Sequence, residues 1–211
     1  ARKKKKKTIY LTFDDGPKKG SRKIMHIAEQ EQVLISMFIN GKHDYGSAEQ
    51  TATYDSLLQC DFVELENHSF THANNRYEKF YSRPDSAVKD FIRCADSLGL
   101  TNNIIRTPGR NIWRTKSINC TDIKKSLHAA DSLQHAGFTA IGWDLEWHFD
   151  NQLNLTNTGD ELIQQVDSLF SKNKTKKPEH LVVLAHNQVY ATTADSPALD
   201  ACIKKFKTAD E

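Results

Sequence analysis

The chain contains few cysteines, and their spacing does not suggest a zinc site. Among 211 residues there are four, at positions 60, 94, 120 and 202, and none form a Cys-x-x-Cys pair. A zinc site built on cysteine is therefore disfavoured. Cys60, Cys94, Cys120 and Cys202 could form up to two disulfides in three pairings, or remain thiols. We favour free or mixed thiols, because a domain of this size does not depend on bridges for its stability.

Long apolar runs and a strong net charge are also missing. No run approaches the roughly 18 apolar residues of a membrane-spanning helix, so no integral membrane segment is expected. The formal net charge is only +2, which gives no global field to attract nucleic acid. The basic excess is local, at Arg2 to Lys7, and we interpret residues 1–7 as a solvated lead-in rather than an anion-binding arm. Because the first residue is Ala1, a processed or trimmed chain is expected, and a removed signal peptide would fit.

Apolar runs alternate with helical periodicities along the rest of the chain. Strands are predicted at 8–13, 33–39, 61–65, 104–105, 138–143 and 180–185, and helices at 21–32, 47–59, 84–98, 122–135, 159–171 and 197–206. This alternation implies right-handed crossovers and a mostly parallel sheet. The sequence therefore predicts an α/β fold with a single domain over residues 8–211, a distorted (β/α) barrel of about seven parallel strands.

Polar clusters follow five of the predicted strands. They are Asp14/Asp15, His68/His72, Arg106, Asp144/Glu146 and His186. In a βα barrel the carboxyl ends of the strands form the rim on which sites are assembled. We therefore expect these clusters to lie near one another.

Each cluster alone is a weak signal. An Asp-Asp-Gly sequence most often forms a solvated turn. His68 and His72 have the i, i+4 spacing that would aim two imidazoles at one point on a helical turn, but such pairs also arise by chance. Two neutral imidazoles with one carboxylate, however, form a three-ligand zinc set that leaves a position for water.

Five ordered motifs resemble those of the NodB-like polysaccharide deacetylases, carbohydrate esterase family four. They are Thr-Phe-Asp-Asp-Gly-Pro at 12–17, His-Ser-Phe-Thr-His at 68–72, Arg-Thr-Pro-Gly-Arg at 106–110, Asp-Leu-Glu-Trp at 144–147 and Val-Leu-Ala-His at 183–186. The resemblance covers about residues 8–206, and its first two motifs are the specific ones. It implies hydrolysis of N-acetyl groups on amino sugars of a polysaccharide, such as peptidoglycan, a chitin-like glycan or poly-N-acetylglucosamine.

The resemblance implies a metal site with a base beside it. The implied metal ligands are Asp15, His68 and His72. Asp14 would be the general base that takes a proton from the attacking water, and Arg106 would hold Asp14 by an ion pair. By ligand type the metal would be Zn²⁺, although Co²⁺ or Ni²⁺ would suit the same set.

An acid and a substrate pocket are implied on the other side. His186 would protonate the departing amine, and Asp144 would orient and charge-stabilise His186. The turn at 108–110 would supply a backbone N–H for the oxyanion. The implied substrate-binding residues are Pro108, Gly109, Arg110, Trp147 and Val183, the last two as walls of the acetyl pocket.

Three residues depart from the pattern of the family that the motifs resemble. Glu146 precedes Trp147 where aspartate is usual, Val183 takes a position assigned to leucine, and Asn187 follows His186 in place of a common aspartate. None of them removes a metal ligand or the base.

The expected protein is a metal-dependent deacetylase with a glycan substrate, acting as a monomer that is secreted, periplasmic or associated with the cell envelope. Three alternatives remain open: an O-acetyl esterase on xylan or another glycan, a catalytically weakened carbohydrate-binding relative, and an anion-binding protein that uses the basic arm. No nucleic-acid partner is expected. The roles of His148, Trp113 and Tyr190 as substrate contacts or packing residues also remain open.

Overall fold

The computed structural model describes residues 6–44, 46–192 and 195–208. The strands are β1 Thr8–Gly16, β2 Ile35–Ile39, β3 Val63–Asn67, β4 Ile104–Ile105, β5 Ile112–Arg114, β6 Asn119–Thr121, β7 Thr139–Ala140, β8 Leu145–Glu146 and β9 His180–His186. The helices are α1 Lys19–Glu31, α2 Gly41–Asp44, α3 Ala48–Leu58, α4 Tyr77–Tyr81, α5 Pro84–Leu98, α6 Leu127–His135, α7 Gly159–Ser171 and α8 Ser196–Thr208, with 3₁₀ turns η1 His72–Asn75, η2 Lys124–Ser126 and η3 Asn187–Ala191.

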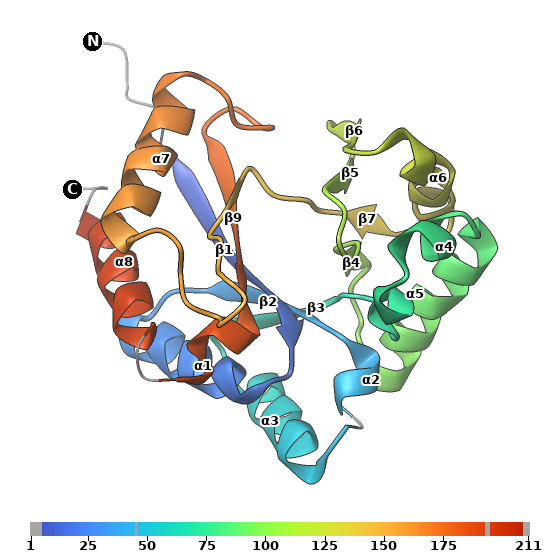
Figure 1. Ribbon diagram of the computed structural model, residues 1–211, viewed down its shortest axis with the longest axis horizontal. Helices are drawn as coiled ribbons and strands as arrows, with labels where there is room; N and C mark the ends of the chain where they lie inside the picture. Colours follow the sequence, from blue (N-terminus) through green and yellow to red (C-terminus); the bar gives the residue numbers. More distant parts are fainter. Residues whose placement is uncertain (1–5, 45, 193–194, 209–211) are drawn as a thin grey trace.

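One curled sheet organises the molecule (Figure 1). Its order is β6-β5-β7-β4-β3-β2-β1-β9-β8, and every pairing is parallel except those made by β5. Without β5 and β6, seven of the nine strands in the described chain are parallel, so the predicted fold class is confirmed. The end strands β6 and β8 are not paired with each other, which leaves a half-barrel that is open along one side.

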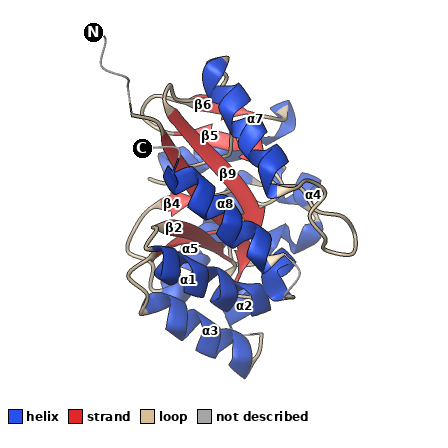
Figure 2. Ribbon diagram, turned by 90° about the vertical axis from the view of Figure 1, so that its left-hand side faces the viewer, coloured by secondary structure: helices blue, strands red, loops and turns tan. Residues whose placement is uncertain are grey.

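Helices cover the outside of the sheet. Helices α1, α7 and α8 lie against the wall formed by β1 and β9, and α5 and α6 lie at the opposite side near β4 and β7 (Figures 1 and 2). Helix α7 starts with a capping box, in which Thr158 and Glu161 satisfy each other's backbone N–H groups. Helix α5 has Pro84 in its first turn and ends at Gly99, whose φ of 63° suits glycine.

Strands β1 and β9 fix which side chains face the lumen. Their register pairs Thr12 with Leu184 and Asp14 with His186. Since successive side chains of a strand point to opposite faces, these even-numbered residues share the inner face. Phe13 and Val183 lie on the other face, in the hydrophobic core beneath α7 and α8.

One strand is shorter than predicted, and one hairpin was not predicted, each for a physical reason. The strand predicted at 138–143 is shortened to β7, because the carbonyls of Ile141 and Gly142 beyond it accept hydrogen bonds from Arg106 and not from a neighbouring strand. The β5–β6 hairpin was not predicted. Its turn is closed by Thr115, whose hydroxyl accepts from the backbone N–H groups of Ser117 and Ile118.

Other expectations can be compared with the described chain. Its helices are all too short or too polar to span a membrane. All four cysteines are free thiols. Most of the predicted lead-in, residues 1–5, lies outside the described residues. Of the rest, Lys7 places its Nζ 5.0 Å from the centre of the Phe170 ring.

Candidate active site

The first motif ends strand β1 with two differently held carboxylates. Asp14 is buried, and its Oδ1 accepts a hydrogen bond of 2.9 Å from Arg106 Nη1. Asp15 has a φ of 71°, and the pairing of β1 with β2 shifts register between Phe13 and Gly16. The left-handed residue turns the chain. Two neighbours in sequence therefore have different surroundings at the same rim.

Arg106 is completely buried and fixed on every side. Its Nη1 also donates to Thr12 Oγ1 at 2.7 Å, and its Nε and Nη2 donate to the carbonyls of Ile141 and Gly142 at 3.1 and 2.9 Å. The Phe38 ring lies 4.1 Å from its Cζ. Burial lowers the pKa of Arg106, while Asp14 opposes that shift. A guanidinium held in this way fixes the Asp14 carboxylate in one orientation, as predicted from the resemblance.

The two histidines of the second motif have their Nδ1 atoms occupied. His68 Nδ1 lies 2.9 Å from the Arg106 carbonyl, and His72 Nδ1 lies 3.3 Å from Asn75 Oδ1. A carbonyl oxygen can only accept, so each Nδ1 carries the proton and each Nε2 has a free lone pair. Burial lowers the pKa of His68, which keeps it neutral as a ligand must be.

The predicted helical turn at this motif is wrong. His68 directly follows β3, and the chain then takes positive φ values of 67° at Ser69 and 50° at His72. The i, i+4 spacing still brings the rings together, with centroids 5.2 Å apart. An irregular loop achieves what a helix was expected to do.

Asp15, His68 and His72 form a set that fits a metal ion. Their ligand atoms all lie within 4.8 Å of one another, and Asp15 Oδ1 is 3.7 Å from His68 Nε2 and 3.2 Å from His72 Nε2. Burial alone would raise the pKa of Asp15, but the positive charges that His68 and His72 carry when protonated, together with Lys18, bring that pKa far below its usual range. One ionised carboxylate with two Nε2 lone pairs is the donor set of a catalytic zinc site.

Two amides that were missed from the sequence hold Asp15. Asn40 Nδ2 donates to Oδ1 at 3.3 Å and Gln188 Nε2 donates to Oδ2 at 3.2 Å. Both residues come just after a strand, β2 and β9 respectively. That position at the carboxyl rim was the signal that could have identified them. Such outer partners orient metal-ligating groups.

His186 lies next to Asp14 on the adjacent strand β9, without the partner predicted for it. The two residues are paired in register, and the Phe149 ring lies with its centroid 5.1 Å from that of His186. His186 Nδ1 is buried, and no hydrogen-bond partner for it exists in the described chain. The orienting group of this imidazole is therefore not Asp144.

Asp144 binds backbone instead, which corrects the role assigned to it. Its Oδ1 accepts from the Lys176 N–H at 2.7 Å and its Oδ2 from the Val182 N–H at 2.9 Å. Its own N–H donates to the carbonyl of Val182, four residues before His186 on β9. At about 3.3 Å per residue, that is about 13 Å from His186. Asp144 fastens the start of β9 and does not reach the imidazole.

The prediction that Trp147 and Val183 wall the acetyl pocket is also wrong. Both are 2% exposed and belong to the outer core against α7 and α8. Trp147 Nε1 donates to the Asn157 carbonyl at 2.9 Å. The alternation along β9 puts Leu184, not Val183, on the face of His186. For Val183 the prediction was one residue away from Leu184, and one residue along a strand is the difference between the two faces of the sheet.

The turn at 108–110 follows β4, and Gly109 is its available donor. Pro108 has no N–H, and the Arg110 N–H is used by the Thr107 carbonyl at 3.3 Å. Across the described residues the Gly109 N–H meets no acceptor. Gly109 has a φ of 63°, and a Cβ added there would lie 2.9 Å from the Tyr77 ring. Glycine is required at this position for both reasons.

Asn187 explains one departure from the family pattern. Its Nδ2 donates to the Asp14 carbonyl at 2.7 Å, and its Oδ1 accepts from Ser21 Oγ at 2.7 Å. An ionised aspartate can only accept hydrogen bonds, so it could not replace the donor to Asp14. Asparagine therefore joins α1 to the base-bearing end of β1.

The structure shows the surroundings of the three residues whose roles the sequence did not decide. Trp113 and Tyr190 are buried, Tyr190 with its ring edge against Phe13, so neither presents a ring to a sugar. His148 is exposed, with Nδ1 3.6 Å from Glu146 Oε1.

Comparison with known proteins places these features in a family. The family model described as "Polysaccharide deacetylase" matches residues 1–115. The "Putative polysaccharide deacetylase YheN" of Bacillus subtilis (strain 168) is 25% identical over 95% of this chain and 64% of its own length. The "Chitin disaccharide deacetylase" of Vibrio alginolyticus is 34% identical over 91 residues, which are 40% of this chain and 20% of that protein. The chain thus spans less than two thirds of the relatives it matches.

Solved structures share the fold at low identity. A Streptococcus mutans CE4 esterase has a TM-score of 0.70 at 20% identity, covering 97% of this chain and 83% of that one. A family 4 carbohydrate esterase of Streptomyces lividans, in complex with acetate, has a TM-score of 0.66 at 17% identity, with 97% and 90% coverage. BA3943 of Bacillus anthracis, described as a CE4 family pseudoenzyme, has a TM-score of 0.64 at 19% identity, with 97% and 62% coverage.

Proposed function

Since the chain belongs to the polysaccharide deacetylase family, we propose that it is a metal-dependent hydrolase that removes N-acetyl groups from amino sugars of a polysaccharide and releases acetate. One observation carries the proposal: the ligand set Asp15, His68 and His72 lies directly beside the Asp14–Arg106 pair. A bound divalent ion would supply Lewis acidity and bring the pKa of water toward about 7. Zinc fits this ligand set best, while cobalt or nickel would suit it as well.

Asp14 is arranged to act as the general base. Its Oδ1 is occupied by Arg106, and its Oδ2 lies 3.6 Å from His68 Nε2, on the side of the metal ligands. The oxygen nearer the ligand set is therefore the one that takes a proton from the attacking water. The Arg106 guanidinium holds the carboxylate by a hydrogen bond but does not transfer its proton to it, because a guanidinium stays protonated.

The remaining two steps of amide hydrolysis have their own groups. Negative charge develops on the carbonyl oxygen of the acetyl group after attack, and the Gly109 N–H can donate to it. The departing amine needs a proton, because an amine anion is a very poor leaving group. His186, paired in register with Asp14, would donate this proton from the adjacent strand β9.

The test is acetate release with and without a chelator. Chito-oligosaccharides, peptidoglycan fragments and acetyl-xylan are assayed side by side. Release from the first two that stops on chelation and returns with Zn²⁺ supports the proposal. Release from acetyl-xylan alone would identify an O-acetyl esterase. Asp14→Asn should lower release by about 10²- to 10⁴-fold, while metal content, measured by elemental analysis, stays equal to that of the unmodified protein.

A second candidate is a carbohydrate-binding relative without turnover. Its support is the His186 Nδ1, which is buried without a partner in the described structure, together with the fold likeness to a pseudoenzyme. In that case neither the unmodified protein nor Asp14→Asn releases acetate, yet both bind chito-oligosaccharides. The expected domain over 8–211, the monomeric state and the secreted, periplasmic or envelope location remain predictions that accompany the first proposal.

A further inference from the structure

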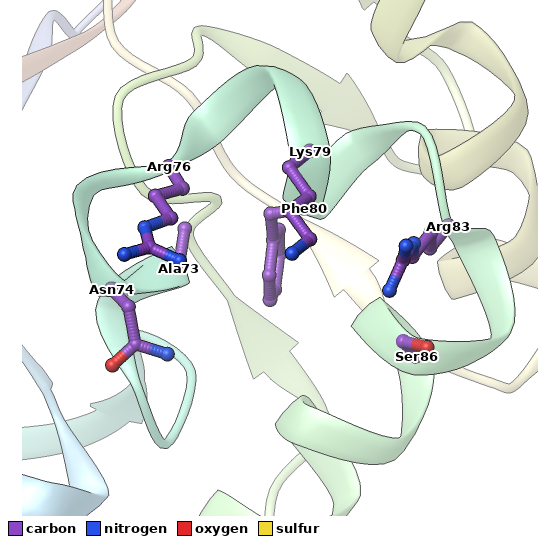
Figure 3. Close-up of a pocket in the computed structure, with 7 residues that line it drawn as sticks. All are labelled: Ala73, Asn74, Arg76, Lys79, Phe80, Arg83 and Ser86. Carbon is purple, nitrogen blue, oxygen red and sulfur yellow. The ribbon is translucent and has the colours of Figure 1, made fainter.

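A hollow lined by basic side chains begins immediately after the metal ligand His72. It has a volume of about 400 Å³ and lies between η1, α4 and the start of α5. Figure 3 shows three cationic side chains around the ring of Phe80. We call it the basic hollow; its lining residues are Ala73, Asn74, Arg76, Lys79, Phe80, Arg83 and Ser86.

The backbone after His72 is what gathers these cations. Residues 72 to 75 all have positive φ values, between 49° and 57°, so the chain turns back on itself before α4. Helix α4 then carries Lys79, and Arg76 and Arg83 flank it at either end. Three cations from a stretch of eight residues thus surround one hollow.

The charges of the basic hollow are not balanced by protein groups. Throughout the described chain, the side chains of Arg76, Lys79 and Arg83 form no ion pair or hydrogen bond. The acid on the same helix, Glu78, is paired with Lys125 at 2.8 Å. Like charges held close together repel one another, and a counter-charge from a ligand relieves that repulsion.

An adjoining depression extends the basic surface toward the catalytic residues. It shares Arg76, Lys79 and Arg83 and adds Tyr77, Arg110 and Glu78, the acid that is paired with Lys125. Arg110 Nε is buried and has no partner among the described residues. The turn that contains Gly109 therefore contributes a fourth cation with an unused donor to this depression.

Tyr77 connects the basic surface to the metal ligands. Its ring meets His72 edge to face, with centroids 5.8 Å apart, and its hydroxyl donates to Asn75 Oδ1 at 3.3 Å. The same Asn75 oxygen accepts from His72 Nδ1. A glycan whose acetamido group reaches Asp15 and His72 would therefore continue over Tyr77 onto the basic hollow.

We propose that the basic hollow binds a carboxylate carried by the glycan substrate, on the sugar next to the one that is deacetylated. Arginine guanidinium groups bind carboxylates through two parallel N–H donors, and Lys79 adds a point charge. The preferred substrate is then an acidic N-acetylated glycan, in contrast to a neutral chitin-like one. This inference rests on the proposed deacetylase function, because it names the substrate class of the same site.

The test compares matched substrates with matched variants. The substrates are a peptide-free tetrasaccharide of alternating N-acetylglucosamine and N-acetylmuramic acid, the same molecule with its lactyl carboxylates converted to methylamides, and neutral chitotetraose. The variant is Arg76→Gln/Lys79→Gln/Arg83→Gln. Its control, Lys172→Gln/Lys174→Gln/Lys177→Gln, removes three exposed cations from the loop before β9.

The unmodified protein should deacetylate the acidic tetrasaccharide with at least about tenfold higher kcat/KM than its methylamide. In the variant this preference should disappear through a higher KM, while chitotetraose turnover stays within about twofold and shows that the fold is intact. The control should keep the preference. Added salt should reduce it. Equal rates on the acidic and amidated substrates, or a preference that survives in the variant, would overturn the inference.

Direct binding separates this inference from the proposed function. Calorimetric titration of the same tetrasaccharides requires no turnover. Tighter binding of the acidic form that is lost in the variant, without acetate release from any substrate, would sink the deacetylase proposal and leave the carboxylate site standing. Acetate release without any preference for the carboxylate would support the deacetylase proposal and overturn the carboxylate site.

Discussion

The two halves of the rim hold their polar groups in different ways. On the half formed by β1, β3 and β4, Asp14, Arg106 and His68 are buried and bonded to one another or to backbone. On the half formed by β8 and β9, His186 leaves Nδ1 unpartnered in the described chain, and Asp144 is engaged elsewhere. The metal-and-base half is preorganised by hydrogen bonds and ion pairs. On the acid half, described protein groups provide no hydrogen bond to His186 Nδ1. Preorganised donors and acceptors are what catalysis at a fixed centre needs.

The largest loss is expected from removing a metal ligand. His68→Ala should lower deacetylation by about 10³-fold or more, because the ion supplies several kcal/mol of transition-state stabilisation. Metal content per chain, measured after gel filtration, should fall with the activity. Asn75→Ala, which removes the hydrogen-bond acceptor of His72 Nδ1 and of the Tyr77 hydroxyl but no metal ligand, should cost about 10- to 100-fold. An intact rate in metal-free His68→Ala would contradict the assignment of this half.

Asp14→Asn is expected to cost about 10²- to 10⁴-fold in kcat with full metal content, because it removes a general base and leaves the ligands in place.

On the acid half, His186→Ala should have an effect of the same size if this residue protonates the amine. The two rate constants, measured on one chito-oligosaccharide, decide whether the halves contribute equally. A much smaller effect at His186 would show that the unpartnered half is not catalytic.

Arg106→Met tests the preorganised half by stability. It leaves Asp14 buried without its charged partner, which should lower the free energy of unfolding by about 3–5 kcal/mol. The double variant Asp14→Asn/Arg106→Met should recover part of that loss, since the unpaired charge is then gone. Denaturant titration measures both. Additive losses would mean that the two side chains are not coupled.

Asp144→Asn should act on stability and not on chemistry. Its carboxylate accepts two backbone N–H bonds, so we expect a loss of about 1–3 kcal/mol. The rate should stay within a few-fold and the pH profile of kcat should be unchanged. A shifted pH profile at unchanged stability would restore the link between Asp144 and His186.

The smallest effect concerns Glu66, an exception on the well-paired half, because its Oε2 lacks a partner in the described structure. Burial and the neighbouring Glu64 raise the pKa of Glu66 to about 8 from 4.5. Between these values the folded protein keeps a proton that the unfolded chain releases, so stability falls as pH rises through the window. Glu66→Gln should therefore gain stability relative to the unmodified protein from about pH 5 to about pH 8. The exposed control Glu49→Gln should show no such trend.

The motif residues and the positions of most strands were predictable because they depend on local sequence. The apolar runs predicted six of the seven parallel strands, all except the two-residue β8, and the order of the motifs gave Asp15, His68 and His72 as neighbours. The predictions that failed concerned which face of the sheet a strand residue occupies and which side chains bind backbone groups. Val183 and Leu184 differ by one position and lie on opposite faces, which no composition reveals without the register to β1.

The role of Asp144 failed for a related reason. Its partners are the backbone N–H groups of Lys176 and Val182, and every residue type except proline offers such a group. Asn40 and Gln188 were missed because single amides have no distinctive pattern. Contacts between side chains of recognisable type were accessible from the sequence, and contacts to backbone were not.

Thr12 connects the two halves with a single hydroxyl. Its only proton is donated to the Val183 carbonyl on β9 at 2.7 Å, so toward Arg106 the oxygen can act solely as an acceptor. The chain of bonds therefore runs one way, from Arg106 through Thr12 to the backbone of β9. Serine could reproduce both bonds at this buried position, whereas valine, of nearly the same shape, could reproduce neither. Position 12 therefore requires a hydroxyl side chain for the centre to keep its hydrogen bonds, although Thr12 itself touches neither the metal ligands nor the acid.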